Sequence, residues 1–211
     1  MRNLQSTPAI HLNNTLHYSS VDTKKLKNEY KIQLVSEASD IRRDVELFIQ
    51  ASYKKHFLAH LSGFFPLILA VTKISDGSII GALGLRYADE EELFSECYLN
   101  QPIEELIKEN ETRKIQRNKI LELGNFVVRE RSDIKNILPV FSQYIKSLDV
   151  DWVVYTLTQP IRFYFDKFAL KLIFLQKADI KAVNGAASDW GRYYKFNPAV
   201  YYSSVQKNMN Y

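Results

Sequence analysis

The sequence predicts an α/β fold in which strands and helices alternate around one sheet. Three observations support this: strand-length apolar runs recur along the chain, amphipathic helical segments separate several of them, and an Asp-Gly turn joins two of them. With 211 residues and 46% hydrophobic side chains, the chain can bury one substantial core. We therefore expect a single domain over residues 29–211, preceded by a polar extension over residues 1–28.

The first half of the predicted domain contains a strand, a helix and a hairpin. Residues 30–35 alternate like a strand, and residues 38–60 carry helical spacing. The apolar runs 66–71 and 79–86 flank Asp76-Gly77, a dipeptide typical of hairpin turns. This hairpin is the clearest local prediction in the chain.

The second half repeats the alternation of strand and helix. A short aromatic and apolar segment, the start of a helix after Pro102 and a charged stretch lead into a strand at residues 120–128. Later elements are a helix, a buried strand, a helix beginning near Pro160, a further strand and a tail rich in aromatic residues. Their ranges are 134–148, 152–158, 160–168, 172–175 and 190–202.

The strand at residues 120–128 contains one carboxylate and one glycine among apolar side chains. An ionisable group in a buried strand needs a partner or a chemical role, so Glu122 is a candidate functional residue. A glycine inside a strand often marks a bulge or a close approach by a backbone or a ligand. We therefore expect something to lie close to Gly124.

A polar turn, residues 129–133, connects this strand to the next helix. Ser132 or Asp133 is the expected N-cap, and the helix N-terminus is a site for a phosphate or pyrophosphate, with Arg129, Arg131 and Lys135 adding positive charge. Most such turns in α/β proteins hold no phosphate, so both interpretations stay open at this point.

Composition excludes several functions. The net charge is +4, from 28 basic and 24 acidic residues that are interleaved, so no basic stripe indicates a nucleic-acid partner. Basic clusters such as residues 113–117 are assigned to the solvated surface. No apolar run approaches the roughly 20 residues of a membrane span, and no secretory signal is recognisable. We expect a cytoplasmic protein without an integral membrane segment.

Cysteine and histidine do not indicate a redox or metal site. The single cysteine, Cys97, excludes an internal disulfide and is interpreted as a buried apolar residue. His56 and His60 have a metal-ligand spacing on the predicted helix, but the sequence offers no adjacent glutamate and no evident third ligand. We expect no bound metal.

Five segments together resemble the thermostable hemolysin family, and the similarity extends from about residue 30 to residue 202. They are residues 65–69 (FPLIL), 81–86 (GALGLR), 93–99 with 102–104 (LFSECYL, PIE), 122–125 (ELGN) and 190–194 (WGRYY). The order of elements resembles the GNAT acyltransferase fold, a central mixed twisted sheet flanked by helices. Members of the family look like distant relatives of acyl-homoserine lactone synthases and other N-acyl transferases.

The resemblance implies an acyltransferase that moves an acyl group from acyl-CoA or acyl carrier protein to the amine of a small molecule or amino acid. It implies no tightly bound cofactor, because the acyl carrier is a co-substrate. In GNAT folds the bulged strand and the following helix N-terminus hold the carrier's pyrophosphate. The expected donor-binding residues are therefore Phe126, Val127, Val128, Arg129, Arg131, Ser132, Asp133 and Ile134.

Glu122 is the expected catalytic residue, because an amine that attacks a thioester must lose a proton. A carboxylate acts as base directly or through a water, and burial raises its pKa toward the working range. Backbone N–H groups near residues 126–128 would hold the oxyanion. The alternative is that Glu122 is a structural hydrogen-bond anchor.

The acceptor site is expected to contain six residues. Arg86 resembles an arginine that the lactone synthases carry at the end of the corresponding strand, and Glu122 falls where they carry a carboxylate. Glu96 is expected to line the same cleft, although an ordinary surface glutamate is the alternative. Aromatic residues of the tail wall the pocket or close the core. The full set is Arg86, Glu96, Asn125, Thr158, Trp190 and Tyr193.

Two departures from the GNAT pattern keep other functions open. The turn at residues 129–135 has no glycine and contains two carboxylates, and Phe165 stands where many GNAT enzymes carry an acidic tyrosine, with Tyr164 about 100° of helix rotation away. One alternative is a non-catalytic module that binds an acyl carrier. Another is a membrane-active hemolysin, against which the lack of a span, a signal or a cationic amphipathic helix argues.

Overall fold

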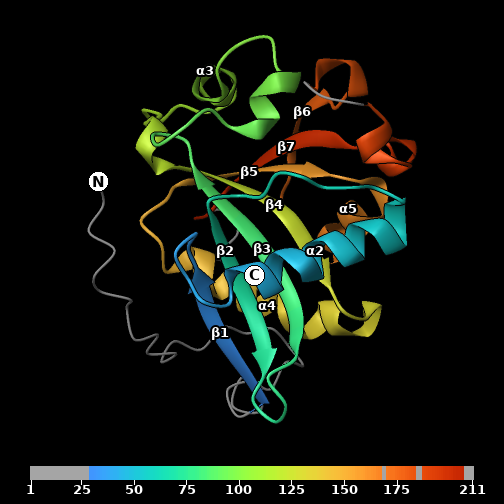
Figure 1. Ribbon diagram of the computed structural model, residues 1–211. Coiled ribbons are helices and arrows are strands. Elements are labelled where there is room, and N and C mark those ends of the chain that lie inside the picture. Colours follow the sequence, from blue (N-terminus) through green and yellow to red (C-terminus); the bar gives the residue numbers. More distant parts are fainter. Residues whose placement is uncertain (1–28, 168–169, 184–186, 207–211) are drawn as a thin grey trace.

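A seven-stranded mixed sheet forms the centre of the molecule (Figure 1). The computed structural model describes residues 29–167, 170–183 and 187–206, so the expected extension over residues 1–28 lies outside the described part. The strand order is β1-β2-β3-β4-β5-β7-β6, in which β4 and β5 are parallel and all other neighbours antiparallel. The strands are β1 (Tyr30–Val35), β2 (Leu67–Lys73), β3 (Ile79–Tyr87), β4 (Ile120–Val128), β5 (Trp152–Leu157), β6 (Ile173–Lys177) and β7 (Ala199–Ser204).

Helices cover both faces of this sheet. The side chains of α2 (Arg42–Phe57) and α3 (Ile103–Lys108) pack in two clusters on one face, whereas α4 (Ile134–Lys146) and α5 (Gln159–Lys167) pack on the other. Short 3-10 turns, including one at Phe94–Tyr98, connect the elements. None of the described helices is long and apolar enough to cross a membrane.

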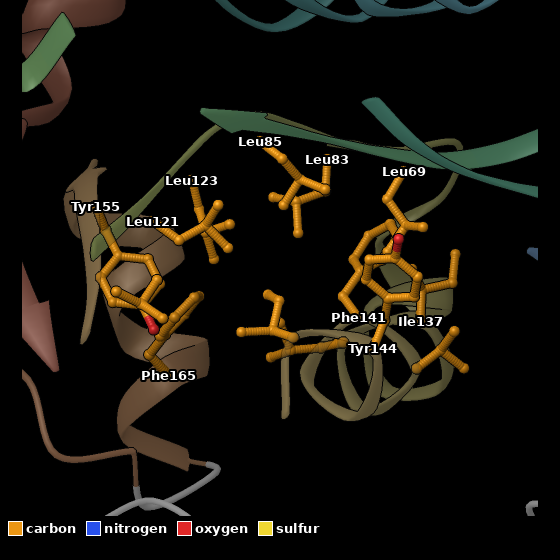
Figure 2. Packing of buried hydrophobic residues seen from close by; sticks show 14 of the residues in the cluster. Leu69, Leu83, Leu85, Leu121, Leu123, Ile137, Phe141, Tyr144, Tyr155 and Phe165 are labelled. Carbon is orange, nitrogen blue, oxygen red and sulfur yellow. The ribbon is translucent and has the colours of Figure 1, made fainter. Parts of the chain in front are cut away.

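The largest core lies between the sheet and α4. Because side chains alternate along a strand, Leu83 and Leu85 of β3 and Leu121 and Leu123 of β4 point to the same face. Figure 2 shows Leu83 and Leu85 on the side of the sheet that faces Phe141 and its neighbours on α4, with Leu121 and Leu123 closer to Tyr155 and Phe165. The strand and helix on either side of the predicted phosphate turn therefore share one hydrophobic core.

The hairpin β2–β3 and strand β4 lie where the sequence predicts them, but the tail contains a strand that the pattern does not indicate. Residues 199–204 form β7 between β5 and β6, and all six of its residues are buried. A strand buried on both faces shows no polar and apolar alternation, which is why residues 201–202 look like part of an irregular aromatic tail.

The helix expected over residues 38–60 is shorter than predicted. It ends at Phe57, where Leu58 adopts a left-handed conformation with φ of 56°. His60 therefore lies beyond the helix, and the metal-ligand spacing of His56 and His60 does not exist in three dimensions. Within the described ranges, no group of three or more His, Cys, Asp or Glu side chains could hold a metal ion.

A bulge in β4 shapes the middle of the sheet. Ala82 of β3 pairs with Val127, but Gly84 pairs with Gly124, so β4 uses one more residue than β3 over this stretch. Asn125 lies in the bulge with φ of 47°, a left-handed conformation that asparagine tolerates better than most residues. The pairing of β4 with β5 covers only Ile120–Leu123, so the two strands part after that point.

Candidate functional site

Two cavities meet where β4 and β5 separate. The large cavity has a volume of about 640 Å³ and lies among β4, β5, α4 and α5. The small cavity, of about 310 Å³, lies among residues 60–65, the end of β3, the middle of β4, and residues 189–193. Six residues line both cavities and define what we call the junction: Tyr53, Leu123, Gly124, Asn125, Thr156 and Tyr193.

Glu122 lies in the wall of the small cavity and is 1% exposed. Its Oε1 accepts a hydrogen bond from the backbone N–H of Ser95 at 2.7 Å, and its Oε2 accepts one from Phe94 at 2.9 Å. Burial raises the pKa of Glu122, outweighing these hydrogen bonds and the positive charge of Arg86. The side chain is therefore a backbone anchor, and its carboxyl group also borders a cavity.

Arg86 lies beside Glu122, also in the wall of the small cavity. Its Nη1 is 3.9 Å from Glu122 Oε2, its Nε is 3.2 Å from Glu91 Oε1, and its guanidinium stacks over the ring of Phe65 at 4.7 Å. Because the distance to Glu122 is long, the guanidinium is not fully paired, and 16% of the Arg86 side chain is exposed. It can bind an anionic group in the small cavity.

The group that approaches Gly124 is the side chain of Phe65. A Cβ atom at residue 124 would overlap the Phe65 ring, and one at Gly84 would lie 2.8 Å from Phe65 Cβ. These glycines are opposite each other in the β3–β4 register and form a shallow seat for the ring. The sequence pattern correctly predicts a close approach, but its partner is an aromatic side chain from the preceding loop.

Glu96 does not line either cavity. Its carboxylate forms a bidentate ion pair with Arg117, with Nη1–Oε1 and Nη2–Oε2 distances of 2.8 and 2.6 Å, and accepts hydrogen bonds from the backbone N–H groups of Leu93 and Ile103. Arg117 also binds Glu104 at 2.6 Å. The expected cleft position is therefore replaced by a structural ion pair, and Arg117 is not a purely solvated surface residue.

The turn after β4 divides the predicted donor-binding residues into two groups. Five of the eight line the large cavity: Phe126, Val127, Val128, Arg131 and Ile134. Arg129, Ser132 and Asp133 do not line it. Arg129 turns away, because its Nε and Nη2 donate to the carbonyl of Ile79 at 2.9 and 2.6 Å.

Asp133 occupies the N-cap position of α4, as expected, but its side chain contacts the preceding turn and does not cap the N–H groups of the helix. Its Oδ2 accepts a hydrogen bond from the N–H of Glu130 at 3.2 Å, and its own N–H donates to the Glu130 carbonyl at 3.0 Å. Two N–H groups of the turn are thus already bonded within the turn.

Most predicted acceptor-binding residues surround the small cavity. Arg86, Asn125, Trp190 and Tyr193 line it, whereas Thr158 lines the large cavity. Trp190 and Tyr193 have ring centroids 5.4 Å apart, and Tyr193 also stacks on Tyr53 of α2 at 6.2 Å. Tyr193 therefore packs in the core and also lines the small cavity.

Several lining residues were not predicted from the sequence. Tyr53 and Thr156 lie at the junction, and Tyr164 lines the large cavity beside Phe165, whose ring packs on Tyr155 with centroids 5.4 Å apart. Tyr53 belongs to the apolar stripe of α2 and Thr156 to an apolar strand. The sequence signal for the position of Phe65 is a glycine in each of two strands, Gly84 and Gly124, which leaves room for a ring once these strands pair.

Solved structures share this arrangement of elements. The AHL synthase LasI is 12% identical, with a TM-score of 0.54 over 87% of this chain and 95% of that chain. FeeM, an N-acyl amino acid synthase from uncultured soil microbes, is 9% identical, with a TM-score of 0.56 over 85% and 92% of the two chains. A protein from Lactobacillus plantarum assigned as an N-acetyltransferase is 10% identical, with a TM-score of 0.51 over 84% and 99%.

These similarities show a GNAT-like α/β fold, as the element order predicts. Comparison with curated protein sequences finds no match. The sequence model of the family described as thermostable hemolysin matches residues 35–209, which is most of the chain. The chain therefore belongs to the thermostable hemolysin family.

Proposed function

We propose that the protein is an acyltransferase that moves an acyl group from a thioester carrier, acyl-CoA or acyl carrier protein, to the amine of a small molecule or amino acid. One observation carries the proposal. A large, mostly apolar cavity and a smaller, relatively more polar cavity meet at the bulge of β4, and a buried carboxylate borders the smaller one. Two substrates bound on either side of the sheet would meet at this junction.

The large cavity suits the acyl donor. Apolar side chains from α4, β5 and α5 make up most of its wall, including Leu138, Phe141, Ile145, Val153 and Leu157. A cavity of about 640 Å³ has room for a medium or long acyl chain as well as the arm of its carrier.

Positive charge lies beside the same cavity. Arg131 lines it and supplies this charge, and His56 also lines it. The pKa of His56 is lowered by partial burial and by the nearby charges of Lys55 and Arg131, so its imidazole is a neutral hydrogen-bond donor. This pair of side chains is suited to the phosphate of a pantetheine arm, whereas Glu130 and Asp133 close the turn that a pyrophosphate would occupy.

The small cavity suits the acceptor. Arg86 would bind an anionic group, and Trp190, Phe94 and Tyr193 form an aromatic wall. In the transfer, the amine nitrogen forms a bond to the thioester carbon and the carbon–sulfur bond breaks. Glu122 takes the proton that the nitrogen loses, and the carrier leaves as a thiolate that is then protonated.

The separation of β4 from β5 supports a further part of the mechanism, the stabilisation of the oxyanion. Residues 124–128 of β4 extend beyond the last pair with β5, and residues 126–128 line the large cavity. Backbone N–H groups of this edge are the proposed donors to the oxyanion that forms during attack.

The experiment has two steps. Native mass spectrometry of the purified protein against acyl-CoA and acyl carrier protein donors of increasing chain length should show saturable binding of one class. Incubation of that donor with a panel of amines and amino acids should then give an amide. Binding without any amide would instead support a non-catalytic carrier-binding module, and absence of binding would overturn the proposal.

A further inference from the structure

The hydroxyl group of Thr156 lies buried at the junction without a hydrogen-bond partner among the described residues. Thr156 is the first residue of β5 beyond the last pair with β4, and it lines both cavities. Its Oγ1 is inaccessible to solvent. Within the described part of the chain, this atom neither accepts nor donates a hydrogen bond. Buried polar groups are almost always satisfied, so an exception at a cavity wall indicates a missing ligand.

Two other polar side chains of the junction, Asn125 and Tyr53, differ from Thr156, because they are already bonded. The Oδ1 of Asn125 accepts a hydrogen bond from the backbone N–H of Phe65 at 3.2 Å. The hydroxyl of Tyr53 is hydrogen-bonded to the Asn125 side chain, and burial raises the pKa of Tyr53 to about 12, so it stays neutral. Thr156 therefore offers a buried side-chain hydroxyl without a partner at the junction, whereas Asn125 and Tyr53 are already paired.

The position of Thr156 restricts what it can bind. It stands on β5, across the gap from the bulge of β4, at the point where the two cavities join. A donor arm in the large cavity and an acceptor in the small cavity would both end there. For transfer to occur, the carbonyl group of the thioester has to lie at that point, because its carbon is attacked by the amine.

We infer that Thr156 is a substrate-binding residue whose hydroxyl donates a hydrogen bond to the carbonyl oxygen of the thioester. The inference rests on the proposed function, because it takes the large cavity as the donor site. The hydrogen bond orients the carbonyl carbon toward the acceptor and supplements the backbone N–H groups of β4 as negative charge develops on the oxygen. No proton is transferred to or from Thr156.

The test measures recognition of the carbonyl in binding alone. Decanoyl-4′-phosphopantetheine, the arm that both carriers share, is compared with S-decyl-4′-phosphopantetheine, which lacks the carbonyl. By calorimetry, the wild-type protein should bind the thioester about fivefold more tightly than the thioether, the ratio expected for one hydrogen bond. Thr156→Val should bind both equally, and Thr156→Ser should restore the preference.

A matched control separates this role from a structural one. Tyr202 also carries a buried hydroxyl without a hydrogen-bond partner in the described residues, but it lines neither cavity. Tyr202→Phe should keep the carbonyl preference. Both Thr156→Val and Tyr202→Phe should keep or raise the melting temperature, because each removes an unsatisfied polar group; a structural hydroxyl would instead give a lower melting temperature in Thr156→Val.

The outcomes distinguish the inference from the proposed function. If Thr156→Val retains the wild-type preference, the inference is wrong and the donor site stands. If the wild-type protein binds both compounds without preference, Thr156 does not recognise the carbonyl. If it binds neither compound, the donor site itself is wrong and both proposals fall.

Discussion

Glu122 and Glu96 both accept backbone hydrogen bonds from the same short segment of chain, and they differ in what else they contact. Glu122 accepts the N–H groups of Phe94 and Ser95, and Glu96 accepts those of Leu93 and Ile103. Glu96 is bidentately paired with Arg117, whereas Glu122 has Arg86 at 3.9 Å. One carboxylate is saturated by a cation, and the other borders a cavity.

The electrostatic consequences are opposite. Burial would raise the pKa of Glu96, but hydrogen bonds from Arg117 and from the backbone outweigh it and lower the pKa. At Glu122 burial outweighs its hydrogen bonds and the pKa is raised. Two carboxylates with the same anchoring role can therefore differ in chemical role, and the difference lies in the arginine.

The largest expected effect on stability comes from removing that arginine. Arg117→Ala should lower the free energy of unfolding by about 3 kcal/mol, because it leaves Glu96 largely buried and without its cation. Arg86→Ala, the matched variant, should cost less, about 1 kcal/mol, since Arg86 lies 3.9 Å from Glu122 and forms no hydrogen bond to it. Urea denaturation measures both; equal losses would remove the distinction between the two glutamates.

Gly124→Ala should lower the free energy of unfolding by about 2 kcal/mol, because the added methyl group overlaps the ring of Phe65 and shifts the stacked Arg86. The control is Gly63→Ala, where a Cβ atom meets nothing within 4 Å. Thermal denaturation compares the two. An unchanged melting temperature in Gly124→Ala would mean that the packing of Phe65 does not depend on the two glycines.

The pH dependence of stability should separate the two carboxylates. Because the folded pKa of Glu122 is raised, its contribution should be lost as pH rises above the ordinary value of 4.5 through that folded pKa. The contribution of Glu96 should be lost as pH falls below 4.5 through its lowered folded pKa. Each unit of pKa shift corresponds to about 1.4 kcal/mol.

Denaturation midpoints of the wild-type protein, Glu122→Gln and Glu96→Gln across this pH range give the two windows. Each variant should differ from wild type with a pH-dependent term only in its own window. A shared window for both variants would show that the two environments are alike.

The smallest expected effect uses Cys97 as a reporter. Burial, followed by the charge of Glu122, raises the pKa of this thiol to about 11. Glu122→Gln should therefore speed alkylation of Cys97 by iodoacetamide about threefold at pH 8. Glu96→Gln should leave the rate near wild type. An unchanged rate in Glu122→Gln would indicate that Glu122 carries no charge at that pH.

Features of the fold and of the candidate site could be predicted from the sequence when the residues that form them lie close together along the chain. Local patterns identify the hairpin at Asp76-Gly77, the strand around Glu122 and the amphipathic helix after it. They also single out Glu122, a carboxylate in an apolar strand, which borders the small cavity. These predictions rest on spacing within a few residues, whereas Arg86 was assigned from the resemblance to the lactone synthases.

Features that depend on pairing between distant segments were missed. Arg117 looked like surface because its partner Glu96 is 21 residues away. The ring of Phe65 is seated by two glycines on different strands, and Thr156 is notable only because β4 and β5 part beside it. Strand β7 was missed because burial on both faces removes the alternation that marks a strand.

The most direct test of the account is amide formation by three proteins under one set of conditions. The wild-type protein, Glu122→Gln and Glu96→Gln are incubated with the best-bound acyl donor and its amine acceptor, and the product is quantified by mass spectrometry. We expect Glu96→Gln to stay within about threefold of wild type and Glu122→Gln to lose at least about 100-fold in turnover while still binding donor. Equal turnover in Glu122→Gln and Glu96→Gln would contradict the assignment of Glu122 as the base.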